Sequence, residues 1–370
     1  MASANREISR LLQSHINAGE FPSAVYLVAE RDEIVFADAL GYSVVEPYRI
    51  ENKFDTIYDL ASLTKPLVTG LLCARSIELG EIALDRPVSR YLAEFDRSDK
   101  QTITIRQLLT HTSGLPAWRP LYLLAEDDPA RAAEAIANLD LEYKPGTRVV
   151  YSDLGFISVG ILLERLVGHP LVQIAKQEIF EALKLEHTFF NPALALQTGI
   201  AACETGNAYE TDMCKQMGSG EYQKSRQRLI WGEVHDGNAY FLGGAAGHAG
   251  LFSTARETFL LAQQFLREST RLLAPETCRM FRENMTAGLE EARSIGWQLA
   301  ATKDSAAGTT LPPDSFGHTG FTGTSLWIDP EHRRIFILLT NRTHARKLPF
   351  ANINAVRRQF NSLAAHALNS

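Results

Sequence analysis

The stretch that decides the fold reads Tyr58-Asp59-Leu60-Ala61-Ser62-Leu63-Thr64-Lys65-Pro66. Ser62 and Lys65 stand three residues apart where an apolar stretch begins, and its apolar residues recur at helical spacing up to Gly80. Side chains at i and i+3 share a helix face with about 5–6 Å between their Cβ atoms, so the Lys65 amine should reach the Ser62 hydroxyl. The segment therefore predicts a helix that begins with a nucleophile and its base.

The start of a helix suits such a pair, because its free N–H groups and partial positive charge stabilise an oxyanion. An S-x-x-K tetrad also occurs by chance in many helices, where the serine is an N-cap and the lysine is solvated. The tetrad therefore has to be weighed together with the rest of the chain.

The bulk composition is that of a globular protein and excludes two classes of partner. The chain has 370 residues, of which 45% are hydrophobic and 22% charged, enough for two domains or one large one. A net charge of −6 without a basic stripe argues against nucleic-acid binding. No apolar run approaches the roughly 20 residues of a membrane span. Nothing in the pattern predicts an oligomeric state.

The cysteines and the N-terminus indicate a reduced compartment. The four cysteines are widely spaced and form no C-x-x-C pair, so we expect buried thiols and no metal site. The sequence has no phosphate-binding loop and no dinucleotide-binding glycine motif, and we expect no cofactor. The N-terminal apolar residues fall at helical spacing and do not form a secretory core, which predicts a cytoplasmic protein. A trimmed signal peptide would instead make it exported.

The strand-like runs lie at both ends of the sequence. They are Ala24–Glu30, Glu33–Leu40, Ser294–Leu299, Thr324–Ile328 and Arg334–Thr340. Between them the chain is mostly helical, as in 105–109, 129–139 and 154–167. We therefore predict an α+β fold, in which residues 1–90 and 254–370 form an antiparallel sheet flanked by terminal helices. Residues 91–253 are predicted to form an inserted, mostly helical domain.

Three further segments carry polar residues that a hydrolase would need. Tyr151-Ser152-Asp153 follows a turn at 144–147 and precedes a helix, which places a phenol on a loop. His318-Thr319-Gly320 opens a strand of the predicted sheet. The run 243–250 contains four glycines, so backbone can approach closely there.

Together these segments resemble the serine β-lactamase and penicillin-binding-protein superfamily, in particular its class C-like branch. That branch includes β-lactamases, D-alanyl-D-alanine peptidases, family VIII carboxylesterases and muramyl-peptide amidases. The resemblance implies a β-lactamase/transpeptidase-like fold. Residues 58–66 resemble the nucleophile motif, 145–153 the tyrosine motif and 318–320 the K-T-G element, and 84–92 and 103–116 resemble two connecting motifs.

The resemblance also implies residue roles. Ser62 would be acylated, and Lys65 and Tyr151 would share the proton transfers, with either of them the base. Because free lysine and tyrosine have pKa values of about 10.4 and about 10, we expect burial and proximity to shift one of them toward neutrality. The N–H groups of Ser62 and Phe321 would form the oxyanion hole.

Two positions depart from the family pattern. His318 stands where the family usually has Lys, followed by Thr319 and Gly320, and Asp153 stands where it usually has Asn. Both changes remove positive or donor character from the substrate site, so a substrate carboxylate should bind less well. Arg342, after the last strand, either restores an anion site or is a solvated arginine.

The predicted substrate is a cell-wall muropeptide, cleaved at an amide. The run Gly232–Ala239 resembles the corresponding segment of muramyl-peptide amidases and gives His235 as a substrate-binding residue, although a loop histidine held by backbone carbonyls is the alternative. One alternative function is a family VIII-like carboxylesterase with weak β-lactamase activity. Another is a penicillin-recognising binding module that does not turn over.

Overall fold

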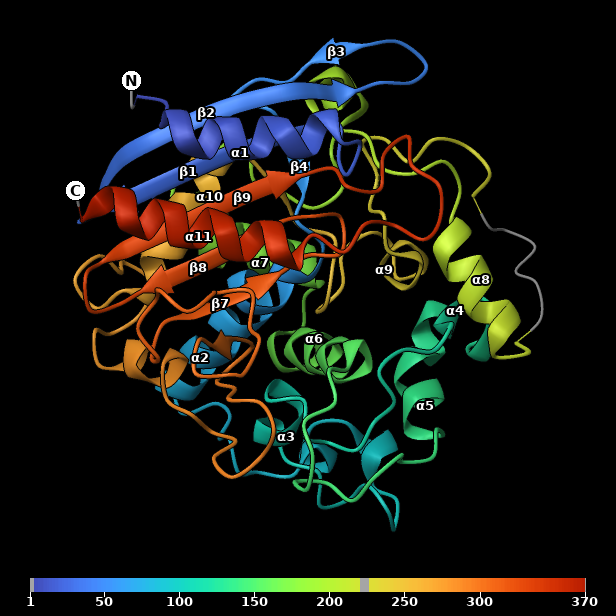
Figure 1. Cartoon of the computed structure of the whole chain (residues 1–370). Helices are drawn as coiled ribbons and strands as arrows, with labels where there is room; N and C mark the ends of the chain where they lie inside the picture. Colours follow the sequence, from blue (N-terminus) through green and yellow to red (C-terminus); the bar gives the residue numbers. More distant parts are fainter. Residues whose placement is uncertain (1–2, 220–225, 370) are drawn as a thin grey trace.

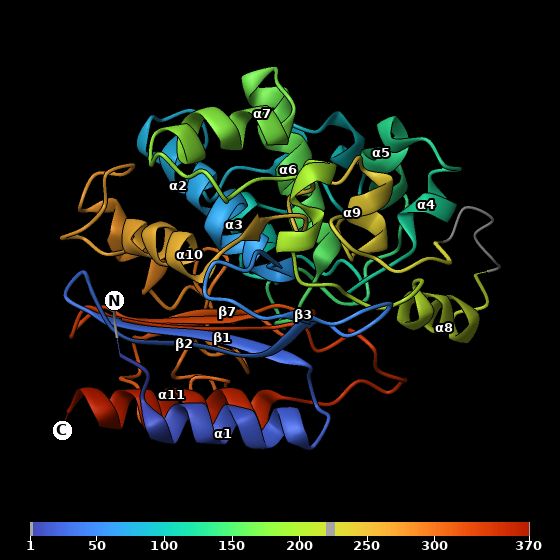
Figure 2. The same cartoon turned by 90° about the horizontal axis from the view of Figure 1, so that it is seen from above.

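The computed structural model describes residues 3–219 and 226–369, and within them one antiparallel sheet carries helices on both faces (Figures 1 and 2). Its strand order is β3-β2-β1-β9-β8-β7-β6. The strands are β1 (Ser23–Glu30), β2 (Glu33–Val44), β3 (Ile50–Glu51), β6 (Gln298–Leu299), β7 (Phe316–Thr319), β8 (Ser325–Asp329) and β9 (Arg334–Thr340), and β4 (Tyr58–Asp59) pairs separately with β5 (Phe252–Ser253).

The α-helices cover both faces of this sheet. They are α1 (Arg6–Asn17), α2 (Leu71–Glu78), α3 (Ile105–Leu109), α4 (Leu121–Leu124), α5 (Ala132–Ala137), α6 (Asp153–Val167), α7 (Leu171–Ala175), α8 (Ala208–Gln216), α9 (Gly237–Phe241), α10 (Ala255–Ala262) and α11 (Asn354–Leu368). Figure 2 shows α1 and α11 side by side on one face, with the other helices on the opposite face except α8, which lies beyond one end of the sheet. The predicted α+β fold with flanking terminal helices is therefore confirmed, and the division at residues 91 and 253 stays a prediction.

The centre of the sheet joins the two ends of the sequence. Strand β1 pairs with β9, so that Leu27 lies opposite Ile337. Alternate side chains of a strand point to opposite faces. Leu27 accordingly packs in the core between the sheet and helices such as α2, α6 and α10. Tyr26 packs in the core on the other face, beneath α1 and α11. The sheet is thus buried on both faces.

The predicted bounds of three elements agree with the structure to within one residue. The helix predicted over 105–109 and the strand predicted over 334–340 have those bounds, and the helix predicted over 154–167 begins one residue earlier. The strand predicted over Ser294–Leu299 is wrong in its first part. Residues 294–297 form a turn closed by the Ser294 N–H and the Trp297 carbonyl, because Gly296 adopts a φ of +73°.

The helix that carries Ser62 begins irregularly. Residues Ala61–Leu63 form a 3₁₀ turn, Lys65–Gly70 a π-helix, and only then does α2 begin. Pro66 has no N–H and cannot bond to the Ser62 carbonyl, which disrupts the α pattern at this point. π-Helical turns are often found at functional sites.

Two further findings concern the helices and the thiols. In the part of the chain that the structure describes, no single helix is long and apolar enough to cross a bilayer, and α6 with the following Leu171–Glu181 reaches that length only as a pair bent by 77°. The four cysteines are buried and free, which confirms the predicted buried thiols.

Candidate active site

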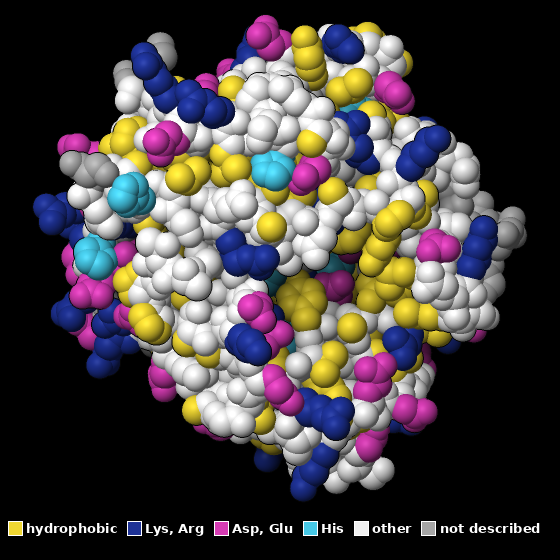
Figure 3. All heavy atoms as spheres, in the orientation of Figure 1, with side chains coloured by type: hydrophobic (Ala, Val, Ile, Leu, Met, Phe, Trp, Pro, Cys, Tyr) yellow, Lys and Arg dark blue, Asp and Glu magenta, His cyan; other side chains and the backbone are white. Residues whose placement is uncertain are grey.

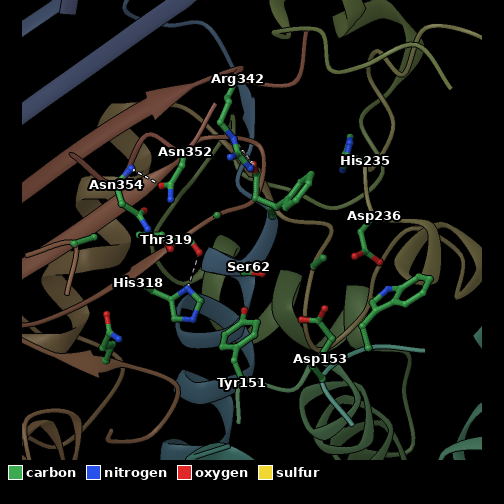
Figure 4. Close-up of a pocket in the computed structure, with 18 of the residues that line it drawn as sticks. Ser62, Tyr151, Asp153, His235, Asp236, His318, Thr319, Arg342, Asn352 and Asn354 are labelled. Atoms are coloured by element: carbon green, nitrogen blue, oxygen red, sulfur yellow. Dashed lines mark hydrogen bonds between the residues drawn. The ribbon is translucent and has the colours of Figure 1, made fainter. Parts of the chain in front are cut away.

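The predicted site residues gather around one cavity of about 530 Å³ between the end of β7 and the helical side of the molecule. Figure 3, drawn in the orientation of Figure 1, shows the cavity as a hollow near the middle of the molecule, with hydrophobic side chains at its edge. In Figure 4, Ser62 and Tyr151 point into the cavity, Asp153 and Asp236 lie to one side, and His318 lies to the other. The predicted residues that line it are Ser62, Tyr151, Asp153, His235, His318, Thr319, Gly320, Phe321 and Arg342.

Lys65 lies behind Ser62 and is fully buried. Its Nζ donates to Ser62 Oγ at 2.9 Å, as the i, i+3 spacing predicted, and to the carbonyl oxygen of His248 at 3.1 Å. Asp153 Oδ1 lies 2.7 Å from the same Nζ, as an ion pair. The glycine-rich run 243–250 therefore contributes a backbone acceptor to the site.

Tyr151 stands beside this group. Lys65 Nζ lies 4.8 Å from the centre of the tyrosine ring, and the His111 ring packs against the tyrosine ring with 4.5 Å between the two centroids. Burial raises the pKa of Tyr151, although the Lys65 ammonium opposes this. Burial alone would lower the pKa of Lys65, but the Asp153 carboxylate and the Tyr151 phenol outweigh it and raise that pKa. The expectation that one of the two pKa values falls toward neutrality is therefore wrong, because burial raises the pKa of Tyr151 and the Asp153 carboxylate raises that of Lys65.

A buried carboxylate shapes the backbone in front of Ser62. Asp59 Oδ1 accepts from the Ala61 N–H at 2.8 Å, and Oδ2 accepts from the His235 N–H at 2.7 Å. Ala61 has a φ of +47°, which L-residues adopt only when their surroundings impose it. Asp59 is thus part of what turns Ser62 into the cavity. The sequence analysis missed this role, although Asp59 lies within the quoted motif.

The turn between β7 and β8 packs directly on the nucleophile segment. Thr322 Oγ1 donates to the Asp59 carbonyl at 2.7 Å, and Thr324 Oγ1 donates to the Leu60 carbonyl at 3.0 Å. A Cβ on Gly320 would lie 2.6 Å from the Leu60 carbonyl oxygen, so only glycine fits at this position. The N–H of Phe321 has no acceptor among the residues described, and it lines the same cavity as Ser62.

His318 is held uncharged. Its Nδ1 donates to the Thr319 carbonyl at 2.9 Å, and its Nε2 is buried without a partner in the described chain. Burial, followed by the charges of Lys65 and Arg293, lowers the pKa of His318 well below its usual value. The position that usually carries a lysine in the resembled family therefore supplies no positive charge.

Arginines from the C-terminal part of the chain line the cavity instead. Arg342 is half-buried, and its guanidinium donates to the carbonyl oxygens of Phe321 and Ala351, so the solvated alternative is wrong. Arg357, on the buried face of α11, donates to the carbonyl oxygens of Gly320 and Thr324. Burial, followed by the charge of Arg342, lowers the pKa of Arg357 to about 9. Neither guanidinium pairs with a carboxylate among the described residues.

The run Gly232–Ala239 contributes side chains that already have partners within the protein. His235 Nε2 lies 2.8 Å from Glu204 Oε1, so a carboxylate and not a backbone carbonyl holds this histidine. Burial would lower the pKa of His235, but Glu204 and Asp59 outweigh it and raise that pKa. Asp236 Oδ1 lies 2.8 Å from His248 Nε2.

Further cavity residues escaped the sequence analysis. Glu210 and Tyr209 come from α8, and Arg293 comes from the turn before β6. Their helix or loop carries no motif, so no local sequence signal could have pointed to them. No group of three or more His, Cys, Asp or Glu side chains in residues 3–219 and 226–369 is placed to hold a metal ion.

The sheet, the flanking helices and this cavity define a serine hydrolase with a β-lactamase-type fold. A beta-lactamase family profile matches residues 8–358, and the chain belongs to that family. A provisionally named D-alanyl-D-alanine carboxypeptidase of Escherichia coli is 31% identical over 369 residues, covering 92% of this chain and 82% of the relative. An N-acetylmuramyl-L-alanine amidase of Bacillus subtilis is 31% identical over 374 residues, covering 92% and 81%.

Solved structures share the fold at lower identity. EstCE1, described as a hydrolase with promiscuous acyltransferase activity, superposes with a TM-score of 0.74 at 22% identity, covering 96% of this chain and 97% of its own. A class C beta-lactamase from Rhodobacter sphaeroides gives a TM-score of 0.73 at 18% identity, covering 98% and 100%.

Proposed function

We propose that the protein is an amidase that forms an acyl-enzyme on Ser62 and that its natural substrate is a cell-wall muropeptide. The observation that carries the proposal is the 2.9 Å contact between Lys65 Nζ and Ser62 Oγ in a cavity that Tyr151 also enters. A serine hydroxyl attacks an amide only when a neighbouring group takes its proton, and this site offers two such groups.

The reaction has two steps. Ser62 Oγ gives its proton to the Lys65–Tyr151 pair and bonds to the amide carbon, and the oxyanion accepts from the N–H groups of Ser62 and Phe321. The C–N bond then breaks, and the leaving amine takes the proton from the pair. Water next attacks the ester, gives its proton to the pair, and Ser62 Oγ leaves with that proton restored.

The muropeptide is supported by the relatives and by the charges in the cavity. The Bacillus subtilis relative is named for the amide between muramic acid and L-alanine. The guanidinium of Arg342, which pairs with no carboxylate among the described residues, suits a carboxylate of a peptide. A cavity of about 530 Å³ is within the usual range for sites that enclose a small molecule.

The test combines a covalent probe with a substrate screen. A fluorophosphonate should add to Ser62, as mass spectrometry of peptides would show, and Ser62→Ala should abolish the adduct. Ser305→Ala is the matched control, because Ser305 lines the same cavity and its hydroxyl donates to the Ala300 carbonyl. Muramyl-tripeptide should release a peptide with a free N-terminal alanine. Labelling that persists in Ser62→Ala would refute the role of Ser62.

A second candidate is a D-alanyl-D-alanine carboxypeptidase. It is supported by the provisional name of the Escherichia coli relative and by Arg342, whose guanidinium suits a terminal carboxylate. Release of D-alanine from a muramyl-pentapeptide, with the muramyl-alanine bond intact, would decide for it. Rapid turnover of short p-nitrophenyl esters alone would instead favour the carboxylesterase, and a stoichiometric burst without further release would favour a binding module.

A further inference from the structure

We propose that Asp153 is a positioning residue that decides which group takes the Ser62 proton: its carboxylate keeps Lys65 as an ammonium ion, which leaves Tyr151 as the base. The inference rests on the acyl-enzyme proposed above. It concerns a position where this chain has an acid and the resembled family usually has an amide.

The contacts of Lys65 by themselves fit two protonation states. Its Nζ lies within 3.1 Å of three oxygen atoms, from Ser62, His248 and Asp153. The carbonyl and carboxylate oxygens only accept hydrogen bonds, whereas the hydroxyl also donates. An ammonium would donate to the hydroxyl and the carbonyl and would pair with the carboxylate through its charge. A neutral amine would donate to the carbonyl and direct its lone pair at the Ser62 hydroxyl.

Charge decides between the two states. Lys65 is fully buried, and a buried amine without an anionic partner loses its proton. Asp153 supplies that partner at 2.7 Å and keeps 17% of its side chain exposed to the cavity. The ion pair therefore favours the ammonium, which has no lone pair for the Ser62 proton.

The other titratable groups that face Lys65 do not replace Asp153. His111 and His318 face it from the end of α3 and from β7, and burial lowers the pKa of each well below its usual value. Asp236 also interacts with Lys65, but its carboxylate is in contact with His248. Tyr151 is the remaining neighbour, and Arg293 lies over its ring at 5.7 Å.

Replacing Asp153 by asparagine would remove the charge of this side chain and keep its shape. Asp153→Asn keeps an acceptor oxygen of the same size beside Lys65 but removes the negative charge that raises the pKa of both Lys65 and Tyr151. Both pKa values should therefore fall, and Lys65 should become a neutral amine. Its lone pair would then take the Ser62 proton, and Tyr151 would no longer be required as the base.

The experiment is a double-mutant cycle on acylation alone. The burst of p-nitrophenolate from p-nitrophenyl acetate reports acylation, because this leaving group departs with the C–O electron pair and needs no proton. In the wild type the Ser62 proton moves to the Tyr151 phenolate as Oγ bonds to the acetyl carbon. We expect Tyr151→Phe to lower the burst rate constant by roughly 10²–10⁴ in the wild type. In Asp153→Asn the same change should lower it less than about tenfold.

The pH dependence and a spectroscopic signal complete the test. The alkaline rise of the burst rate should move to lower pH in Asp153→Asn and stay in place in the control Asp304→Asn, an exposed acid that lines the same cavity. The NMR signal of isotope-labelled Lys65 Cε should report an ammonium in the wild type and a neutral amine in Asp153→Asn at neutral pH. This readout requires no activity, and circular dichroism would check the fold.

Each failure has a distinct meaning. If the fluorophosphonate does not label Ser62, the proposed function fails. Suppose that Ser62 is labelled, but Tyr151→Phe lowers the burst rate constant by the same factor in the wild type and in Asp153→Asn. This inference alone is then overturned. An unchanged Lys65 signal in Asp153→Asn would overturn it as well.

Discussion

Arg357 Nη2 donates to the carbonyl oxygen of Gly320 at 2.9 Å, so the terminal helix α11 fixes the peptide that presents the Phe321 N–H. The carbonyl and the N–H of a trans peptide point in opposite directions, and Arg357 therefore directs that N–H away from α11. A lysine at position 357 would lack the planar guanidinium group, which in the wild type also donates to the Thr324 carbonyl. Arg357→Lys should lower kcat on a p-nitrophenyl ester by roughly 10-fold to 10²-fold and leave KM nearly unchanged.

The control for that variant lies one residue further along the helix. Arg358 belongs to the same α11 but extends to the Asp304 carbonyl at the surface. Arg358→Lys should leave both kinetic constants unchanged. A rise in KM without a fall in kcat for Arg357→Lys would show that the guanidinium binds substrate and does not align the oxyanion donor.

Replacing Asp59 should weaken the fold and the reactivity of Ser62 together. In Asp59→Asn, the amide NH₂ would face one of the two backbone N–H groups that the carboxylate now accepts, from Ala61 and His235. A buried donor left without a partner costs about 1–3 kcal/mol. Urea denaturation should show a loss of that size, and the rate of fluorophosphonate labelling should fall. Asp55→Asn, at an exposed turn, should change neither.

The contact between Gly320 and the nucleophile segment predicts a steric effect. A Cβ at this position would lie 2.0 Å from Thr324 Oγ1 and 2.6 Å from the Leu60 carbonyl oxygen. Gly320→Ala should therefore destabilise the protein by about 1–3 kcal/mol and displace the oxyanion donor. Thermal unfolding measures the first effect, and labelling of Ser62 the second. Gly199→Ala, where an added Cβ meets nothing within 4 Å, is expected to be tolerated.

A lysine in place of His318 should improve the recognition of carboxylates. Because burial and neighbouring positive charges lower the pKa of His318, the wild type gains no charge there between neutral and mildly acidic pH. His318→Lys should raise kcat/KM for nitrocefin about tenfold, which corresponds to about 1.4 kcal/mol of added attraction. The added cation also lowers the pKa of Tyr151, so the alkaline rise should move to lower pH. His318→Gln, without a charge, should show neither change.

The sequence predicted the fold where local patterns and family motifs coincide. The 3.6-residue repeat of α6 and the continuous apolar run of β9 gave bounds within one residue, because both elements are largely buried. The failure at Ser294–Leu299 came from Gly296, whose positive φ turns the chain where the apolar residues suggested a strand.

Only those residues of the candidate site that lie within sequence motifs could be predicted. Ser62, Lys65 and Tyr151 meet because their motifs lie on segments that the fold brings together. Arg357 and Glu210 line the same cavity, yet each lies on a helix whose neighbours are set by tertiary packing, which no local pattern reveals. The expected fall of one pKa in the Lys65–Tyr151 pair was wrong because the pKa of Lys65 depends on its distance to Asp153, a contact across 88 positions of sequence.

The pairing of β1 with β9 also makes activity a late event during synthesis. Leu27 meets its partner Ile337 only after more than three hundred further residues have been made. Until then the early strand has an open edge, and the turn that presents Phe321 is not anchored by α11. A chain still held on the ribosome before position 334 should therefore be inert toward acylating probes, although it already contains every residue of the serine motif.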